Sequence, residues 1–110
     1  MKDFIDLDGA SGATYRFRLW PEGAPHQPIA GNYVCVRPDA ARPGGYQVTY
    51  VGESTDLSRA RIEMPKALKG PGVMVYTRLN VSRAIRTTEH EDLAARHPEE
   101  RARRAAKKVV

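Results

Sequence analysis

Two tyrosines of this chain, each two residues from a glycine, have a spacing that suggests a shared chemical site. Tyr33 belongs to the β-branched run at 31–36, and Tyr50 belongs to a second such run at 46–52. The residues between the runs, 37–45, include two prolines and end in a glycine pair, so we expect a hairpin with a longer loop. Neighbouring strands would bring both phenolic hydroxyls to one place. The alternative is that both rings pack in the sheet with their hydroxyls at its rim.

An arginine on the element that follows occupies an apolar stripe. A polar cluster ending at Asp56 is typical of a helix start. At 3.6 residues per turn, one stripe of this helix holds Leu57, Ala60, Arg61, Met64, Ala67 and Leu68. Arg61 is the only charge on that stripe, so it must find an anion or reach water. Arg59 points the other way, and Pro65 predicts a break around residues 64–66.

A carboxylate with a similar position occurs later in the chain. We expect a strand at 73–81, followed by a helix from Ser82 to about Ala95. Glu89 stands four residues from Ile85 and four from Leu93, so it lies between two apolar neighbours on one helix face. The alternative is that residues 88–91 form a capping box, which would restart the helix there and leave Glu89 exposed.

Length and composition limit the class of protein. A chain of 110 residues with 41% hydrophobic content corresponds to one globular domain. Cys35 is the single cysteine, so no internal disulfide forms, which fits a reducing compartment. The first eight residues lack the basic start and apolar run of a signal peptide, and no segment has membrane-spanning length. We therefore expect a soluble cytoplasmic protein without a membrane partner.

The net charge of +5 is unevenly distributed. Residues 1–30 carry −1, residues 31–70 carry +2 and residues 71–110 carry +4. A last helix, opened by Pro98, has its acidic residues first and its basic residues last, as the helix dipole favours. The basic surplus suits a nucleic acid, and equally a solvated helix. The candidate phosphate contacts are Arg59, Lys66, Arg103, Arg104, Lys107 and Lys108.

The N-terminal third predicts a further hairpin. Residues 4–7 and 15–20 alternate apolar with charged or polar types around the turn-forming cluster at 8–12, and a proline-rich link follows. We therefore expect an α+β fold, with a small antiparallel sheet of three core strands plus this hairpin, flanked by helices. The predicted organisation is a hairpin extension and link at 1–30, a central domain at 31–98 and a basic helix at 99–110.

The central stretch resembles a GIY-YIG nuclease domain. Members of that family have a Gly-x-Tyr strand, a Tyr-x-Gly strand and a helix start of the type Ser/Thr-x-Asn/Asp-Leu, matched here by residues 31–33, 50–52 and 54–57. They also have a glutamate nine residues before a proline, as Glu89 is before Pro98. The resemblance covers residues 31–98. The family arginine falls at Ala60 of this chain, and Arg61 is the nearest replacement on the inward face.

The resemblance implies phosphodiester hydrolysis assisted by one divalent metal, Mg²⁺ or Mn²⁺. It implies Tyr33 as general base or base relay, Tyr50 as its hydrogen-bonding partner, Arg61 as phosphate clamp and Glu89 as metal ligand. An unperturbed tyrosine has a pKa of about 10, so Tyr33 would need a nearby cation to act as a base.

Three functions follow as hypotheses. The first is a small metal-dependent DNA endonuclease, acting on plain, structured or damaged DNA. The second is a catalytically inactive domain of the same fold that binds nucleic acid. The third is a protein-interaction module, whose N-terminal hairpin has more apolar side chains than the core can cover, namely Phe4, Ile5, Phe17, Leu19 and Trp20.

Overall fold

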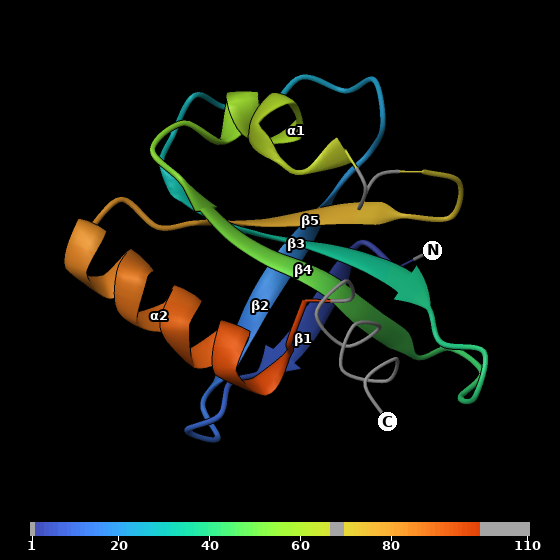
Figure 1. Ribbon diagram of the computed structural model, residues 1–110. Helices are drawn as coiled ribbons and strands as arrows, with labels where there is room; N and C mark the ends of the chain where they lie inside the picture. Colours follow the sequence, from blue (N-terminus) through green and yellow to red (C-terminus); the bar gives the residue numbers. More distant parts are fainter. Residues whose placement is uncertain (1, 67–69, 100–110) are drawn as a thin grey trace.

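The computed structural model describes residues 2–66 and 70–99. Its centre is a five-stranded antiparallel sheet in the order β1-β2-β5-β3-β4 (Figure 1). The strands are β1 (Phe4–Asp8), β2 (Thr14–Trp20), β3 (Gly31–Pro38), β4 (Tyr46–Ser54) and β5 (Met74–Leu79). The expected α+β class with a small antiparallel sheet is confirmed.

The strand that holds Tyr33 is covered on both faces. β3 pairs with β4 on one side and with β5 on the other, and residues 31–36 are all buried. The predicted hairpin of β3 and β4 is confirmed, with a bulge where Cys35 pairs with Tyr50 but Val36 pairs with Val48. The unpaired residue between them, Thr49, donates its hydroxyl hydrogen bond to the carbonyl of Cys35 at 3.1 Å.

The N-terminal hairpin belongs to the same sheet. β2 pairs with β5, so β1 and β2 extend the three strands of the central region. Ile5 and Phe17 of the hairpin are 6% and 0% exposed, and they pack in the core with Val34 and Leu93. Residues 1–30 therefore contribute strands and core residues to the sheet that holds the tyrosines.

The helices lie on opposite faces of the sheet (Figure 1). A 3-10 turn (Leu57–Arg59) and α1 (Ala60–Glu63) cover the face that includes Tyr33, Cys35 and Trp20. The helix α2 (Arg83–Arg96) covers the other face, where Leu93 packs on Val34, Val36 and Val51. Because side chains alternate along β3, residues 33 and 35 face α1, whereas residues 32, 34 and 36 face α2.

The first helical segment ends where Pro65 predicts a break. Asp56 caps it by accepting from the backbone N–H of Ser58, as expected. The helix ends at Glu63 because Met64, which precedes Pro65, is extended with φ −68° and ψ 148°. Ala67 and Leu68 of the predicted stripe lie outside the described residues.

The second helix runs without interruption from Arg83 to Arg96, and Ser82 caps its start. A restart of the helix at residues 88–91 is therefore wrong. The expected apolar stripe is also shifted, since Ile85 is 54% exposed while Arg86 is buried. No helix in the described part of the chain is long and apolar enough to cross a membrane.

Candidate functional site

The structure brings the two tyrosines together, as predicted. The ring centroids of Tyr33 and Tyr50 are 6.0 Å apart, on the face that α1 covers. Tyr33 pairs with Gly52, and its ring lies directly over that glycine, where a Cβ atom would come within 2.2 Å of Tyr33 Cζ. A Cβ on Gly31 would come within 2.2 Å of the carbonyl oxygen of Arg78. Both glycines of the tyrosine motif are therefore required by close packing.

The surroundings of Tyr33 oppose the role of a base. The residue is 3% exposed, and burial raises the pKa of its hydroxyl far above the ordinary value. Tyr50, Cys35 and the carboxylate of Glu63 raise the pKa further. Tyr33 therefore keeps its proton at neutral pH, and its hydroxyl is suited to donating a hydrogen bond.

Arg61 lies away from the tyrosines, over β2. Its guanidinium carbon is 4.1 Å from the centre of the Trp20 ring, and it donates to the carbonyl oxygens of Trp20 and Pro21. Burial lowers the pKa of Arg61, and these contacts stabilise the desolvated charge. Tyr50 belongs to β4. Because β5 and β3 lie between β2 and β4, these two strands are about 14 Å apart.

Arg61 lines a cleft of about 370 Å³ together with Trp20, Met64 and Val75. The described residues that line this cleft do not include either tyrosine. This cleft therefore does not combine Arg61 with the tyrosine pair.

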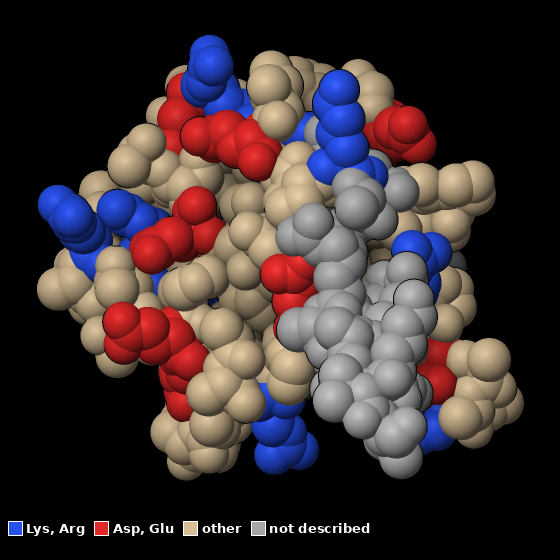
Figure 2. Space-filling view, in the orientation of Figure 1, with Lys and Arg blue, Asp and Glu red and all other residues tan. Residues whose placement is uncertain are grey.

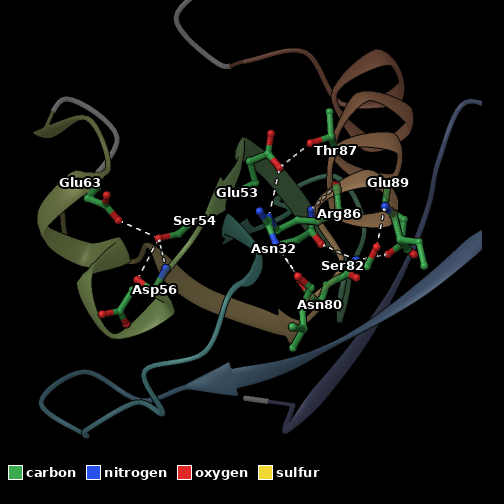
Figure 3. A network of polar contacts seen from close by, with 12 residues as sticks. Asn32, Glu53, Ser54, Asp56, Glu63, Asn80, Ser82, Arg86, Thr87 and Glu89 are labelled. Carbon is green, nitrogen blue, oxygen red and sulfur yellow. Dashed lines mark hydrogen bonds and ion pairs between the residues drawn. The ribbon is translucent and has the colours of Figure 1, made fainter.

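Glu89 lies on the other side of the sheet (Figure 3). Its Oε1 atom accepts from Arg78 Nε at 2.8 Å and from Asn80 Nδ2 at 3.1 Å. Asn80 also donates to the side chain of Asn32, which is adjacent to Tyr33 in β3 and so points to the opposite face. The four residues predicted as one site are thus divided by the sheet, with Glu89 alone on the α2 face.

The contacts of Glu89 continue into a buried polar network. Arg86, 6% exposed, donates to the carbonyls of Asn80 and Val81 at 3.2 and 3.1 Å. Its Nε atom is 3.5 Å from a Glu53 carboxylate oxygen. Asn32 donates to the carbonyl of Arg86 at 3.0 Å. These side chains join the sheet to the first turns of α2 (Figure 3).

The structural role of this network was not predicted from the sequence. Its clearest indication was Asn32, a polar residue inside an otherwise apolar strand. A fully buried amide must be hydrogen-bonded, which predicts polar partners on whatever element covers that face. The partners themselves, Asn80 and Arg86, come from a loop and a helix whose placement depends on the tertiary fold.

A different carboxylate, Glu63, is the one that influences Tyr33. It accepts a hydrogen bond from Ser54 Oγ at 2.8 Å, and it contributes to the raised pKa of Tyr33. Figure 3 shows this group beside α1, apart from the network around Glu89. No spacing in the sequence predicts the contact of Glu63 with Ser54, because the two residues meet only where the chain turns from β4 into α1.

The residues around Glu89 do not fit a divalent cation. Mg²⁺ and similar ions require several oxygen ligands, and they are repelled by a neighbouring guanidinium. Glu89 has the Arg78 guanidinium on its carboxylate. Within residues 2–66 and 70–99, no group of three or more His, Cys, Asp or Glu side chains is placed to hold a metal.

The charged residues of the described part balance. Of the 18 Lys and Arg, six fall at positions 69, 101, 103, 104, 107 and 108, outside the described residues, as does Glu100 of the 13 acidic residues. Twelve of each sign remain, so the whole net charge of +5 falls on residues 67–69 and 100–110. Figure 2 shows the two signs interspersed on the visible face.

Some of the predicted phosphate contacts lie within the described residues and the others lie outside them. Arg59 and Lys66 are exposed on and after the first helical segment. Arg103, Arg104, Lys107 and Lys108 lie outside the described residues. Comparison with known proteins adds nothing to these assignments, since no family model, curated protein or solved structure matches the chain.

Proposed function

We propose that this chain is a GIY-YIG-type domain that binds nucleic acid without cutting it. One observation carries the proposal: the Glu89 carboxylate is paired with Arg78 and Asn80 on the face opposite the tyrosines. In-line attack on a phosphodiester requires the nucleophile, the phosphate clamp and the charge-stabilising group in one place. That division, together with the raised pKa of Tyr33, supports binding over hydrolysis.

The charge distribution supports the binding part of the proposal. Affinity for nucleic acid comes mainly from Lys and Arg near phosphates, and it weakens steeply with salt. Residues 100–110 carry five basic side chains against one acidic side chain, whereas the described residues are balanced. Residues 100–110 therefore supply the contacts to the phosphate backbone. The single buried cysteine, Cys35, is compatible with action in the cytoplasm.

The test uses the purified full chain with labelled single-stranded, duplex and branched DNA and with RNA. We expect binding at low salt that weakens steeply as salt rises, and intact nucleic acid after incubation with Mg²⁺ or Mn²⁺. Absence of binding to any of these at low salt would contradict the proposal.

A Mg²⁺-dependent DNA endonuclease is the second candidate. The observation that favours it is the contact of the Tyr33 and Tyr50 rings, 6.0 Å apart on one face. Metal-dependent nicking that disappears in Tyr50→Phe would establish this candidate in place of the first. Tyr50 is only partly buried, so the substitution leaves the fold intact.

The hypothesis of a protein-interaction module loses its main support, which was an excess of exposed apolar side chains on the N-terminal hairpin. Ile5, Phe17 and Trp20 of the N-terminal hairpin are at most 6% exposed, so the core of this chain covers them. Phe4 is the large apolar residue of the hairpin that stays open, at 49% exposure.

A further inference from the structure

The cleft of about 370 Å³ beside Arg61 lies between α1 and the strands β2 and β5. Its described walls are apolar apart from two side chains, Arg61 and Glu22. Trp20, Met64 and Val75 are at most 6% exposed, and they belong to the core cluster that α1 covers. Small-molecule sites in proteins have volumes of about 300–1,000 Å³. The cleft is therefore an opening in that core with room for a small ligand.

Arg61 places a positive charge in this cleft. Its guanidinium packs on the Trp20 ring, and its Nη1 and Nη2 atoms donate to the carbonyls of Pro21 and Trp20. These partners fix the direction of the guanidinium, but they carry no net charge. The ion pairs of the described residues do not include Arg61. Within the described part of the chain, the half-buried charge of Arg61 therefore has no carboxylate at contact distance.

The guanidinium of Arg61 can donate to a further acceptor. A guanidinium has five N–H groups, and the two carbonyls take two of those of Arg61. A carboxylate accepts two parallel hydrogen bonds from one guanidinium, and this pair is stronger where water is partly excluded. The walls around the guanidinium are apolar, so the rest of a ligand contacts hydrocarbon and aromatic surface. A phosphate fits less well, because its additional charge and oxygens would face those apolar walls without donors.

We propose that this cleft binds a small apolar carboxylic acid, with its carboxylate on Arg61 and its apolar body against Trp20, Met64 and Val75. Glu22 also lines the cleft, but its side chain is exposed, so water and salt screen its repulsion of an anion. The proposal does not rest on binding of nucleic acid, whose predicted contacts do not line this cleft.

The fluorescence of Trp20, the single tryptophan of the chain, reports entry of a ligand. We expect phenylbutyrate and octanoate to change this emission saturably, in the full chain without nucleic acid. The uncharged phenylbutyramide should bind at least about tenfold more weakly than phenylbutyrate, because it cannot form the charged pair. Phenethyl phosphate should also bind more weakly.

Three results with these probes would overturn the proposal. A lack of saturable response to both acids would mean that the cleft is not a site for them. Equal affinity for phenylbutyrate and its amide would mean that the charge is not recognised. Tighter binding of phenethyl phosphate would make the cleft a phosphate site.

A pair of variants tests the role of Arg61. Arg61→Gln removes the charge and should weaken the binding of phenylbutyrate at least about tenfold. Arg83→Gln removes the same charge from the exposed first residue of α2, on the other face of the sheet, and should retain the affinity. Isothermal titration calorimetry measures both, because Arg61 contacts Trp20 and so affects its fluorescence directly. Equal weakening in the two variants would mean that net charge alone attracts the acid, which contradicts the proposal.

Glu22→Gln tests the same site without disturbing the core, since Glu22 is exposed. Loss of its negative charge should tighten the binding of phenylbutyrate and leave that of phenylbutyramide unchanged. Weaker binding of phenylbutyrate in this variant would mean that Glu22 itself contacts the ligand, and the assignment of the carboxylate to Arg61 would be wrong.

Discussion

Asn32 and Glu89 act as partners within the polar network between β3, β5 and α2. Asn32 is fully buried, and it accepts from Asn80 while donating to the carbonyl of Arg86. Glu89 accepts from both Asn80 and Arg78 through one oxygen atom. The carboxylate therefore has a structural role, and its removal leaves the guanidinium of Arg78, whose side chain is two-thirds buried, without this anion.

Glu89→Ala should lower the free energy of unfolding by about 1–3 kcal/mol, because it removes the acceptor of a part-buried charged pair. Glu89→Gln should cost less, since its amide oxygen still accepts from Asn80. Urea denaturation in Mg²⁺ and in EDTA provides the measurement. Equal losses in both solutions are expected, and a loss seen only with Mg²⁺ would restore Glu89 as a metal ligand.

Gly52 is required by the ring of Tyr33. Gly52→Ala places a methyl group within 2.6 Å of three atoms of the Tyr33 side chain, so it should destabilise the chain by about 1–3 kcal/mol. In a Tyr33→Leu background the shorter side chain leaves room, and the same substitution should cost less. A double-mutant cycle by thermal unfolding measures the coupling. Equal costs in the two backgrounds would show that the ring is not the obstacle.

At the scale of elements, Asp92 joins α2 to the turn between β1 and β2. Its carboxylate accepts from the hydroxyl and N–H of Ser11, at 2.7 and 2.8 Å, and from the Tyr15 hydroxyl at 2.7 Å. The side-chain hydrogen bond from Ser11, followed by that from Tyr15, lowers the pKa of Asp92. The N-terminal hairpin is thus held along one edge by the pairing of β2 with β5 and at its turn by α2.

This arrangement predicts acid sensitivity. A carboxyl whose pKa is lower in the folded state stabilises the fold above its unfolded pKa of about 3.9, and the contribution disappears as pH falls through the folded pKa. Asp92→Asn should therefore flatten the loss of stability below about pH 4. Urea midpoints between pH 2 and pH 6 provide the measurement, with Glu91→Gln, an exposed neighbour, as control. An unchanged acid profile in Asp92→Asn would contradict the assignment.

The end of α1 at Glu63 accompanies the placement of two of its side chains. Because the helix ends at Glu63 before Pro65, the chain places Glu63 near Tyr33 and Ser54. Arg61 then reaches across to Trp20, the single tryptophan of the chain.

For the whole molecule, the proposed binding of nucleic acid depends on where the charge lies. Residues 100–110 carry +4 of the net charge of +5, so phosphate contacts should be concentrated there. Each contact to duplex DNA contributes about −0.9 to the slope of log K against log salt, so the double variant of Arg103→Gln and Arg104→Gln should reduce the slope by about 1.8.

The matched control removes the same charge from the described part, in a double variant of Arg59→Gln and Lys66→Gln. Fluorescence anisotropy between 25 and 200 mM salt measures both slopes. The control should keep the slope of the unsubstituted chain. A larger change in the control than in the first variant would place the binding surface beside α1.

Much of the fold follows from local patterns. The runs at 31–36 and 46–52, the alternation in the N-terminal hairpin and the caps at Asp56 and Ser82 all predict the observed elements. These features depend on neighbours within a few residues, which the sequence presents directly. The contact of Tyr33 with Tyr50 follows in the same way, since adjacent strands of a hairpin bring their side chains together.

The direction of Glu89 could not be obtained from the sequence. Its helix phase placed it beside Leu93 on a face turned toward the sheet, although Ile85 of the same predicted stripe is exposed, and the phase does not state which face of the sheet α2 covers. That choice is made by long-range packing, in which Leu93 enters the core beside Val34 and Val51. The sequence therefore determined the strands, the caps and the tyrosine pair, whereas the tertiary structure alone placed Glu89 and Arg61 apart from that pair. Burial of distant apolar residues puts α2 and Glu89 on the opposite side of the sheet, and the contact of Arg61 with Trp20 holds it over β2 on the tyrosine side.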